Sequence, residues 1–119
     1  MATANELVSR SLRLLGVIAS GETIEASVGQ DALSVLNGLL AEMHESGIGL
    51  PQYSVSTLSA TLTLDAADME AVAYQLAIRI APEYGLTPSP QHFTTAAQSM
   101  FRLRQRYLQP SHPIPATYY

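Results

Sequence analysis

The apolar stretch that begins near residue 66 constrains the fold more than any other part of the chain. Its apolar residues recur at intervals of three and four: Met69, Val72, Ala73, Leu76, Ala77 and Ile80. This spacing places them on one face of a helix. Pro82 lacks an amide hydrogen and crowds the carbonyl four residues back, and Gly85 readily adopts the left-handed conformation that ends helices. The sequence therefore predicts an apolar helix that ends at about residue 84.

Two helices are predicted before this stretch. Thr3 and Glu6 have the spacing of a capping box, in which each side chain satisfies an amide at the start of a helix. That helix should reach about residue 15. Thr23 is the expected N-cap of a second helix that continues to about residue 46. Gly29 and Gly38 lie inside it at a cost of up to ~1 kcal/mol each, and we interpret both as positions where another helix packs closely.

A fourth helix is predicted after the apolar one. Asp65 is a good N-cap for the apolar helix itself, and Ser89 with Pro90 at the first helical position begins the next, which should reach about residue 108. Its expected apolar stripe is Phe93, Ala96, Ala97, Met100, Leu103 and Tyr107. The predicted fold class is all-α, an antiparallel bundle of about four helices over residues 1–109. Residues 110–119 are predicted to form an extended, proline-containing tail.

Residues 57–64 alternate between apolar and hydroxyl side chains, which is a strand signal of period two. One strand is not stable alone. The segment therefore pairs with a neighbouring chain, pairs with another short segment of the same chain, or lies as an extended loop. In the first case Leu58, Leu62 and Leu64 are the candidate residues of an inter-subunit strand.

The composition limits the classes of partner. Charged residues make up 13% of the chain, against about 25% in an average soluble protein, which suggests a surface covered by neighbouring molecules. All ten acidic residues and three arginines lie in residues 1–85, whereas residues 86–119 contain three arginines and no acidic residue. The acidic bulk argues against a nonspecific nucleic-acid binder. No apolar run approaches the ~20 residues of a membrane span and no signal peptide is visible, so we expect no membrane partner.

Few residues have the pattern of a chemical site. The three histidines, His44, His92 and His112, have no partner at metal-ligand spacing, and the chain contains no cysteine. The chain also lacks a nucleophile elbow and a phosphate-binding glycine loop. We therefore expect no catalytic, metal or cofactor-binding residue, no cofactor, and no enzymatic activity.

The basic C-terminal part supplies the candidate partner-binding residues. Arg102 and Arg106 share a helix face and Arg104 points elsewhere. These arginines either extend from a packed helix into solvent or meet an acidic partner surface or phosphates. The tail is either a disordered terminus or an anchor in a partner's groove. Its candidate contact residues are Pro110, Pro113, Ile114, Pro115, Tyr118 and Tyr119.

The order of these signals resembles the head-to-tail adaptor proteins of tailed bacteriophages, also called head-completion or packaged-DNA-stabilisation proteins. The resemblance covers about residues 5–108 and rests on five motifs: Leu-Leu-Gly-Val at 14–17, Ser-Gly-Glu-Thr at 20–23, Leu-Asn-Gly-Leu-Leu at 36–40, Leu-Thr-Leu at 62–64 and Leu-Ala-Ile-Arg-Ile-Ala-Pro-Glu-Tyr-Gly at 76–85. Many relatives carry a longer segment, often with β-hairpin character, between the second and third helices. In this chain only residues 48–64 lie between the second and third predicted helices.

The resemblance implies a structural virion protein at the head–tail interface, present in the host cytoplasm during assembly. Such adaptors form a ring, typically of twelve copies, beneath the portal protein. The ring extends the DNA channel, retains packaged DNA and supports a downstream tail or nozzle protein, and DNA passes through it without sequence-specific binding. The arginines and the tail would then contact the portal or a neighbouring subunit. The alternative is a small helical interaction or regulatory protein whose C-terminal tail is a partner-binding peptide.

Overall fold

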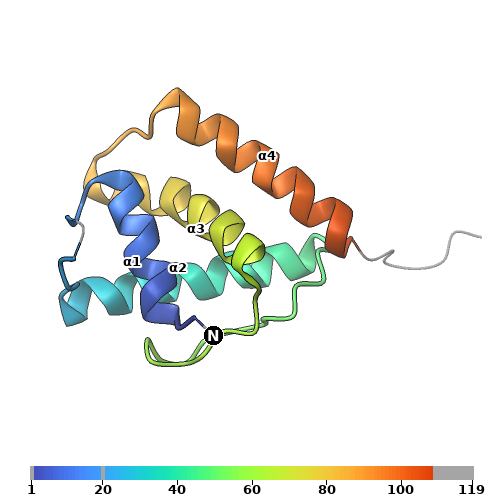
Figure 1. Ribbon diagram of the computed structural model, residues 1–119, viewed down its shortest axis with the longest axis horizontal. Coiled ribbons are helices and arrows are strands. Elements are labelled where there is room, and N and C mark those ends of the chain that lie inside the picture. The colour runs from blue at the N-terminus through green and yellow to red at the C-terminus, as the bar shows by residue number, and fades with distance from the viewer. Residues whose placement is uncertain (1, 20, 109–119) are drawn as a thin grey trace, which may run out of the picture.

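The computed structural model describes residues 2–19 and 21–108, which fold into four α-helices. These are α1 (Ala4–Leu15), α2 (Ala26–Glu45), α3 (Ala66–Ile80) and α4 (Pro90–Tyr107), and the short 3-10 helix η1 (Ala81–Tyr84) follows α3. Figure 1 shows α3 between α2 and α4. The described residues form no β-strand, so the predicted all-α fold of four helices is confirmed. The predicted tail, residues 110–119, lies outside the described residues.

Helix α3 is the element on which the other helices pack. It contacts α1, α2 and α4, and its buried residues are Asp68, Ala71, Val72, Ala73, Leu76, Ala77 and Ile80. Leu12 of α1, Leu36 of α2 and Leu103 of α4 belong to the same core. A helix that is buried on several sides must be largely apolar, as the spacing in the sequence indicates.

Both ends of α3 follow from local rules. At its start, the Asp65 carboxylate accepts a hydrogen bond from the Asp68 amide at 3.0 Å, which satisfies one of the orphan amides of the first turn. At its end, the regular helix stops at Ile80 and tightens into η1, because Pro82 has no amide hydrogen to continue the pattern. Gly85 then adopts the left-handed conformation, with φ 67°. The predicted end of the apolar helix is confirmed.

The caps of α1 and α4 are also confirmed, whereas that of α2 is wrong. Thr3 accepts a hydrogen bond from the Glu6 amide, and Ser89 accepts one from the His92 amide. Helix α2 begins at Ala26, after Glu25 rather than Thr23. Ile24, which lies before this cap, packs against the core from outside the helix.

The two glycines of α2 differ in their surroundings. A Cβ atom on Gly29 would lie 2.7 Å from Leu58 Cδ1, so this position is closely packed, although the neighbour is a loop residue and not a helix. A Cβ atom on Gly38 would meet nothing within 4 Å, and Gly38 is exposed. The prediction of close packing is therefore wrong for Gly38 within this chain.

The connection between α2 and α3 is long and irregular, but it is firmly attached. Its apolar side chains lie in the core: Ile48, Leu50, Val55, Leu62 and Leu64. Asn37 of α2 holds its middle, because the side-chain amide donates to the Val55 carbonyl at 2.8 Å and accepts from the Val55 amide at 2.7 Å. Both ring nitrogens of His44 lie 2.9 Å from backbone carbonyls, those of Leu40 and Leu50.

Residues 57–64 contact the N-terminus of the same chain. Thr3 and Thr61 form an isolated antiparallel bridge, and the Leu62 amide donates to the Ala2 carbonyl at 2.8 Å. Leu62 and Leu64 are buried, whereas Leu58 is only partly buried over Gly29. Of the options open from the sequence, the described chain pairs this segment with its own N-terminus, through a bridge and not a strand. Pairing with a neighbouring subunit stays a prediction.

The difference between the two glycines can be measured. Gly38→Ala should raise the free energy of unfolding by about 0.5–1 kcal/mol, because alanine favours the helix and the new methyl group meets open space. Gly29→Ala should raise it by less or lower it, because the Leu58 side chain must move. Urea unfolding followed by circular dichroism measures both, and equal effects would contradict the packing assigned to Gly29.

Candidate interaction surfaces

Ion pairs connect two of the helices to α3. Arg10 of α1 pairs with Glu70 of α3 at 2.6 Å. Arg79 of α3 makes two hydrogen bonds to the Glu42 carboxylate of α2, at 2.8 and 2.9 Å, and these lower the pKa of Glu42. All four side chains are partly exposed to solvent, so the pairs orient the helices more than they stabilise them.

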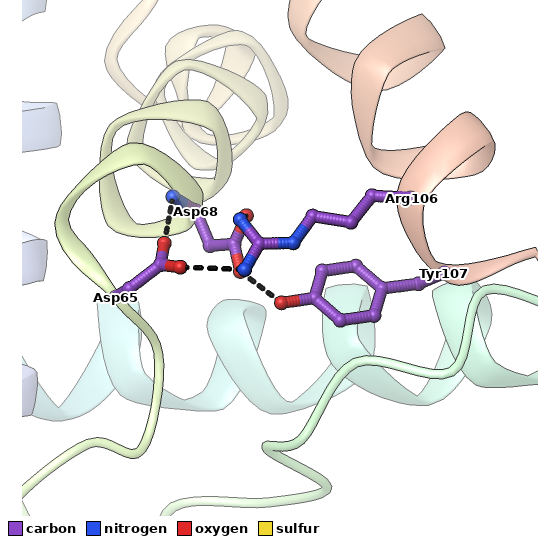
Figure 2. Close-up of polar contacts among 4 residues, drawn as sticks. All are labelled: Asp65, Asp68, Arg106 and Tyr107. Atoms are coloured by element: carbon purple, nitrogen blue, oxygen red, sulfur yellow. Dashed lines mark hydrogen bonds and ion pairs between the residues drawn. The ribbon is translucent and has the colours of Figure 1, made fainter.

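A third connection joins α4 to the start of α3, through the polar cluster of Asp65, Asp68, Arg106 and Tyr107 shown in Figure 2. Arg106 Nη2 lies 2.8 Å from Asp65 Oδ2, and Arg106 Nη1 lies 3.5 Å from Asp68 Oδ1. The Tyr107 hydroxyl donates a hydrogen bond to Asp68. Carboxylates at a helix N-terminus and a cation in a last turn also suit the two helix dipoles. The cluster therefore fixes α4 antiparallel to α3.

Burial makes Asp68 the central member of this polar cluster. Its side chain is only 4% exposed, whereas those of Arg106 and Asp65 are about half exposed. The hydrogen bond to Asp68 raises the pKa of Tyr107. The pKa of Asp65 is lowered, first by the Asp68 amide and also by the Arg106 guanidinium.

The cleft beside the polar cluster is too small for a substrate. Its volume is about 110 Å³, which has room for only a few waters at ~30 Å³ each and is below the ~300 Å³ of the smallest usual ligand pockets. The side chains that line it are Ala67, Asp68, Ala71, Ser99, Arg102, Leu103 and Arg106. We therefore assign the polar cluster a structural role.

The three arginines of α4 have different surroundings, which the sequence did not distinguish. Arg106 forms ion pairs with residues of the same chain, in the polar cluster. Arg102 and Arg104 are exposed, and within residues 2–19 and 21–108 neither forms an ion pair. Their guanidinium groups are available to a partner.

Helix α4 also exposes aromatic side chains. Of its predicted apolar stripe, Ala96 and Leu103 are buried, and Met100 and Tyr107 pack against the core, but Ala97 and Phe93 are exposed. Phe93 is 46% and Phe101 60% exposed. Phe101 was missed in the sequence analysis, although it continues the four-residue spacing of 93 and 97. We define the α4 outer face as Phe93, Ala97, Phe101 and Arg104, which share one side of the helix, whereas Arg102 lies on the flank that lines the cleft beside the polar cluster.

Large exposed aromatic side chains on one helix face are typical of an interaction surface. At one edge of the α4 outer face, Ala97 and Phe101 line a shallow depression together with Gln98 and Arg102. The helix packs on α3 with its other side, which carries Ala96, Ser99 and Leu103. The apolar pattern of α4 is thus wider than its contact with this chain.

The histidines have local structural surroundings. His44, which has no partner at metal-ligand spacing in the sequence, is an anchor of the connection between α2 and α3, and its ring stacks on Tyr53 with centroids 4.1 Å apart. His92 makes an edge contact with Tyr74. His112 and the six tail candidates, Pro110, Pro113, Ile114, Pro115, Tyr118 and Tyr119, lie outside the described residues, so the contacts proposed for the tail stay predictions.

Two further findings concern residues 2–19 and 21–108 only. No three histidine or acidic side chains lie close enough together there to bind a metal ion. None of the helices there combines the length and hydrophobicity needed to cross a bilayer.

Comparison with known proteins identifies a family. A family model described as P22 tail accessory factor matches residues 1–113. This range contains all four helices, the connection between α2 and α3, and the α4 outer face. No curated protein matches the chain.

Mutation of the polar cluster should reveal coupled side chains. Asp68→Ala should lower the free energy of unfolding by about 1–3 kcal/mol, because it leaves the Tyr107 hydroxyl and Arg106 without their buried acceptor. Tyr107→Phe should lower the free energy of unfolding by about 1 kcal/mol. The double variant should lower it by less than the sum of the two single effects. Additive effects in urea unfolding would show that the two side chains do not interact.

The same cluster should make stability depend on acid pH. The folded-state pKa of Asp65 lies below its ordinary value of 3.8, so the unfolded chain takes up the proton first as the pH falls. The contribution of Asp65 to stability is therefore complete at pH values well above 3.8 and is lost as the pH falls through the folded-state pKa.

Urea midpoints measured between pH 7 and pH 3 check this prediction. In Asp65→Asn the fall below pH 4 should be shallower than in the parent chain. Identical pH profiles for Asp65→Asn and the parent would contradict the assignment.

Proposed function

The chain belongs to the P22 tail accessory factor family, and from this premise we propose that it is a structural protein of a phage virion that acts where the tail joins the head. One observation carries the proposal, namely that the family model matches residues 1–113 and so contains every described helix. The proposed role is to bind other virion proteins and not to catalyse a reaction.

The protein acts, in this proposal, as a ring of copies, typically twelve, beneath the portal protein. The ring extends the DNA channel, retains packaged DNA and provides a platform for a downstream tail or nozzle protein. Two properties support it. The low charged fraction of 13% suits a surface that neighbours cover, and the α4 outer face exposes aromatic side chains that no described residue covers.

The charge distribution suits a channel through which DNA moves. The chain has a net charge of −4 and no lysine. A strongly basic wall would bind the phosphates and hold the DNA in place, whereas an acidic one allows it to slide without sequence-specific binding.

The proposed contact residues divide into two groups. Arg102 and Arg104 contact the portal or a neighbouring subunit, and the tail residues after Gln109 dock on the portal or an adjacent copy. Arg106 is left out of this group because it pairs with Asp65 and Asp68. Among the strand candidates, Leu58 is the one whose side chain is partly exposed, beside Thr3 and Ser59 in a shallow depression.

The test is reconstitution with the portal protein encoded by the same phage or prophage. The full chain should co-sediment with the portal, and electron microscopy should show an additional ring on the portal axis. A variant that ends at Gln109 should bind more weakly with unchanged helix content. A chain that stays monomeric beside an unaltered portal would overturn the proposal and favour an interaction or regulatory protein.

Phage particles offer a second readout. Particles assembled without this protein should lose packaged DNA, and the purified chain added to them should restore retention. Full retention of DNA in particles that lack the protein would contradict its proposed role in holding the genome.

A further inference from the structure

The residues of the α4 outer face indicate the chemistry of the partner that it can bind. It presents two exposed aromatic rings, Phe93 and Phe101, at a spacing of eight residues, with the small residue Ala97 between them. Arg104 adds a cation without an ion-pair partner among the described residues. A fitting partner therefore offers a helix-sized groove with small side chains and carboxylates.

The chain itself carries such a surface on α2. A row of residues on this helix recurs at alternating intervals of four and three and is exposed throughout: Ser27, Asp31, Ser34, Gly38, Ala41 and Glu45. We define these six as the α2 outer face. Such spacing forms one continuous stripe along a helix. Four of the six are small, and Gly38 has open space in front of its Cα atom.

We propose that the α4 outer face of one copy packs against the α2 outer face of the next copy. This proposal rests on the ring proposed above and names the contact that closes it. In this contact the aromatic rings of α4 pack on the small side chains of Ser34, Gly38 and Ala41. The absence of large side chains there lets another helix approach closely.

The charges of the two faces are complementary. The α4 outer face carries Arg104, and α4 contains no acidic residue. The α2 outer face carries Asp31 and Glu45, and α2 contains no arginine or lysine. Glu42 of α2 is excluded because it pairs with Arg79. Two surfaces of opposite sign steer each other into one register and resist contacts between identical faces.

The positions of the two helices fit a ring. A closed ring needs a head-to-tail contact, in which each copy uses two different surfaces. Helix α3 lies between α2 and α4 and contacts both, as Figure 1 shows. The two outer faces therefore belong to different sides of the molecule, and one copy can contact two neighbours at the same time.

The absence of cysteine from the chain allows a direct test. Phe101→Cys and Gly38→Cys are prepared as separate proteins, mixed with the portal protein or alone at high concentration, and treated with a bismaleimide that spans about two helical turns. The expected product is a dimer that contains one chain of each variant. Ala19→Cys, which changes an exposed residue of the loop between α1 and α2, replaces Gly38→Cys in the control and should give far less dimer.

Each result decides the proposal. A mixed dimer of Phe101→Cys with Gly38→Cys, in either sample, supports the contact. Dimers of Phe101→Cys with itself would show that two α4 faces meet, and links from Phe101→Cys to the portal or to the tail would assign the face to those partners. Either outcome overturns the proposal, as does the absence of any mixed dimer. Binding to the portal is measured separately, so a failure of the proposed function can be distinguished from a failure of the proposed contact between copies.

Charge reversal provides an independent check. Arg104→Glu should lower the yield of rings on the portal by about tenfold, because a carboxylate then faces the α2 outer face, which carries Asp31 and Glu45. Adding Asp31→Arg and Glu45→Arg to the same chain should restore the yield. All three residues are exposed, and unchanged circular dichroism confirms that the fold is intact. Failure of the threefold variant to recover, with the fold intact, would contradict the assigned pairing.

Discussion

The burial of α3 is the constraint on which the rest of this structure depends. A helix of small and branched apolar residues, from Ala71 to Ile80, cannot remain in water, and α1, α2 and α4 cover it. Each of these helices is also joined to α3 by one arginine: Arg10, Arg79 and Arg106. The apolar contacts supply most of the stability, and the arginines, at solvent-exposed edges, set which end of each helix meets α3.

Features that depend on neighbouring residues in the sequence were predictable. The cap at Asp65, the cap and proline at the start of α4, and the end at Pro82 and Gly85 are consequences of local backbone chemistry. Features that depend on distant residues were not. Thr23 is a better cap than Glu25 by its side chain, yet α2 begins after Glu25, and the intervening Ile24 packs against the core.

The interaction surfaces show the same division. The three arginines of α4 look alike in the sequence, and only the approach of Asp65 and Asp68 gives Arg106 ion-pair partners within the chain. The period of 57–64 correctly places Leu62 and Leu64 on the buried side, but it does not identify their partner, which is the N-terminus of the same chain. No sequence pattern predicted the role of Asn37, because its side chain bonds the backbone carbonyl and amide of one distant residue, Val55.

A helix that exposes two phenylalanines must also avoid the wrong partners. Two α4 outer faces that met would bring two arginines together, because each carries Arg104 and no carboxylate, and this repulsion opposes pairing of identical surfaces. The same arginine is attracted to a surface that carries acids and no bases, as α2 does. The composition of α4 therefore opposes symmetric dimers and suits the head-to-tail contact of the proposed ring.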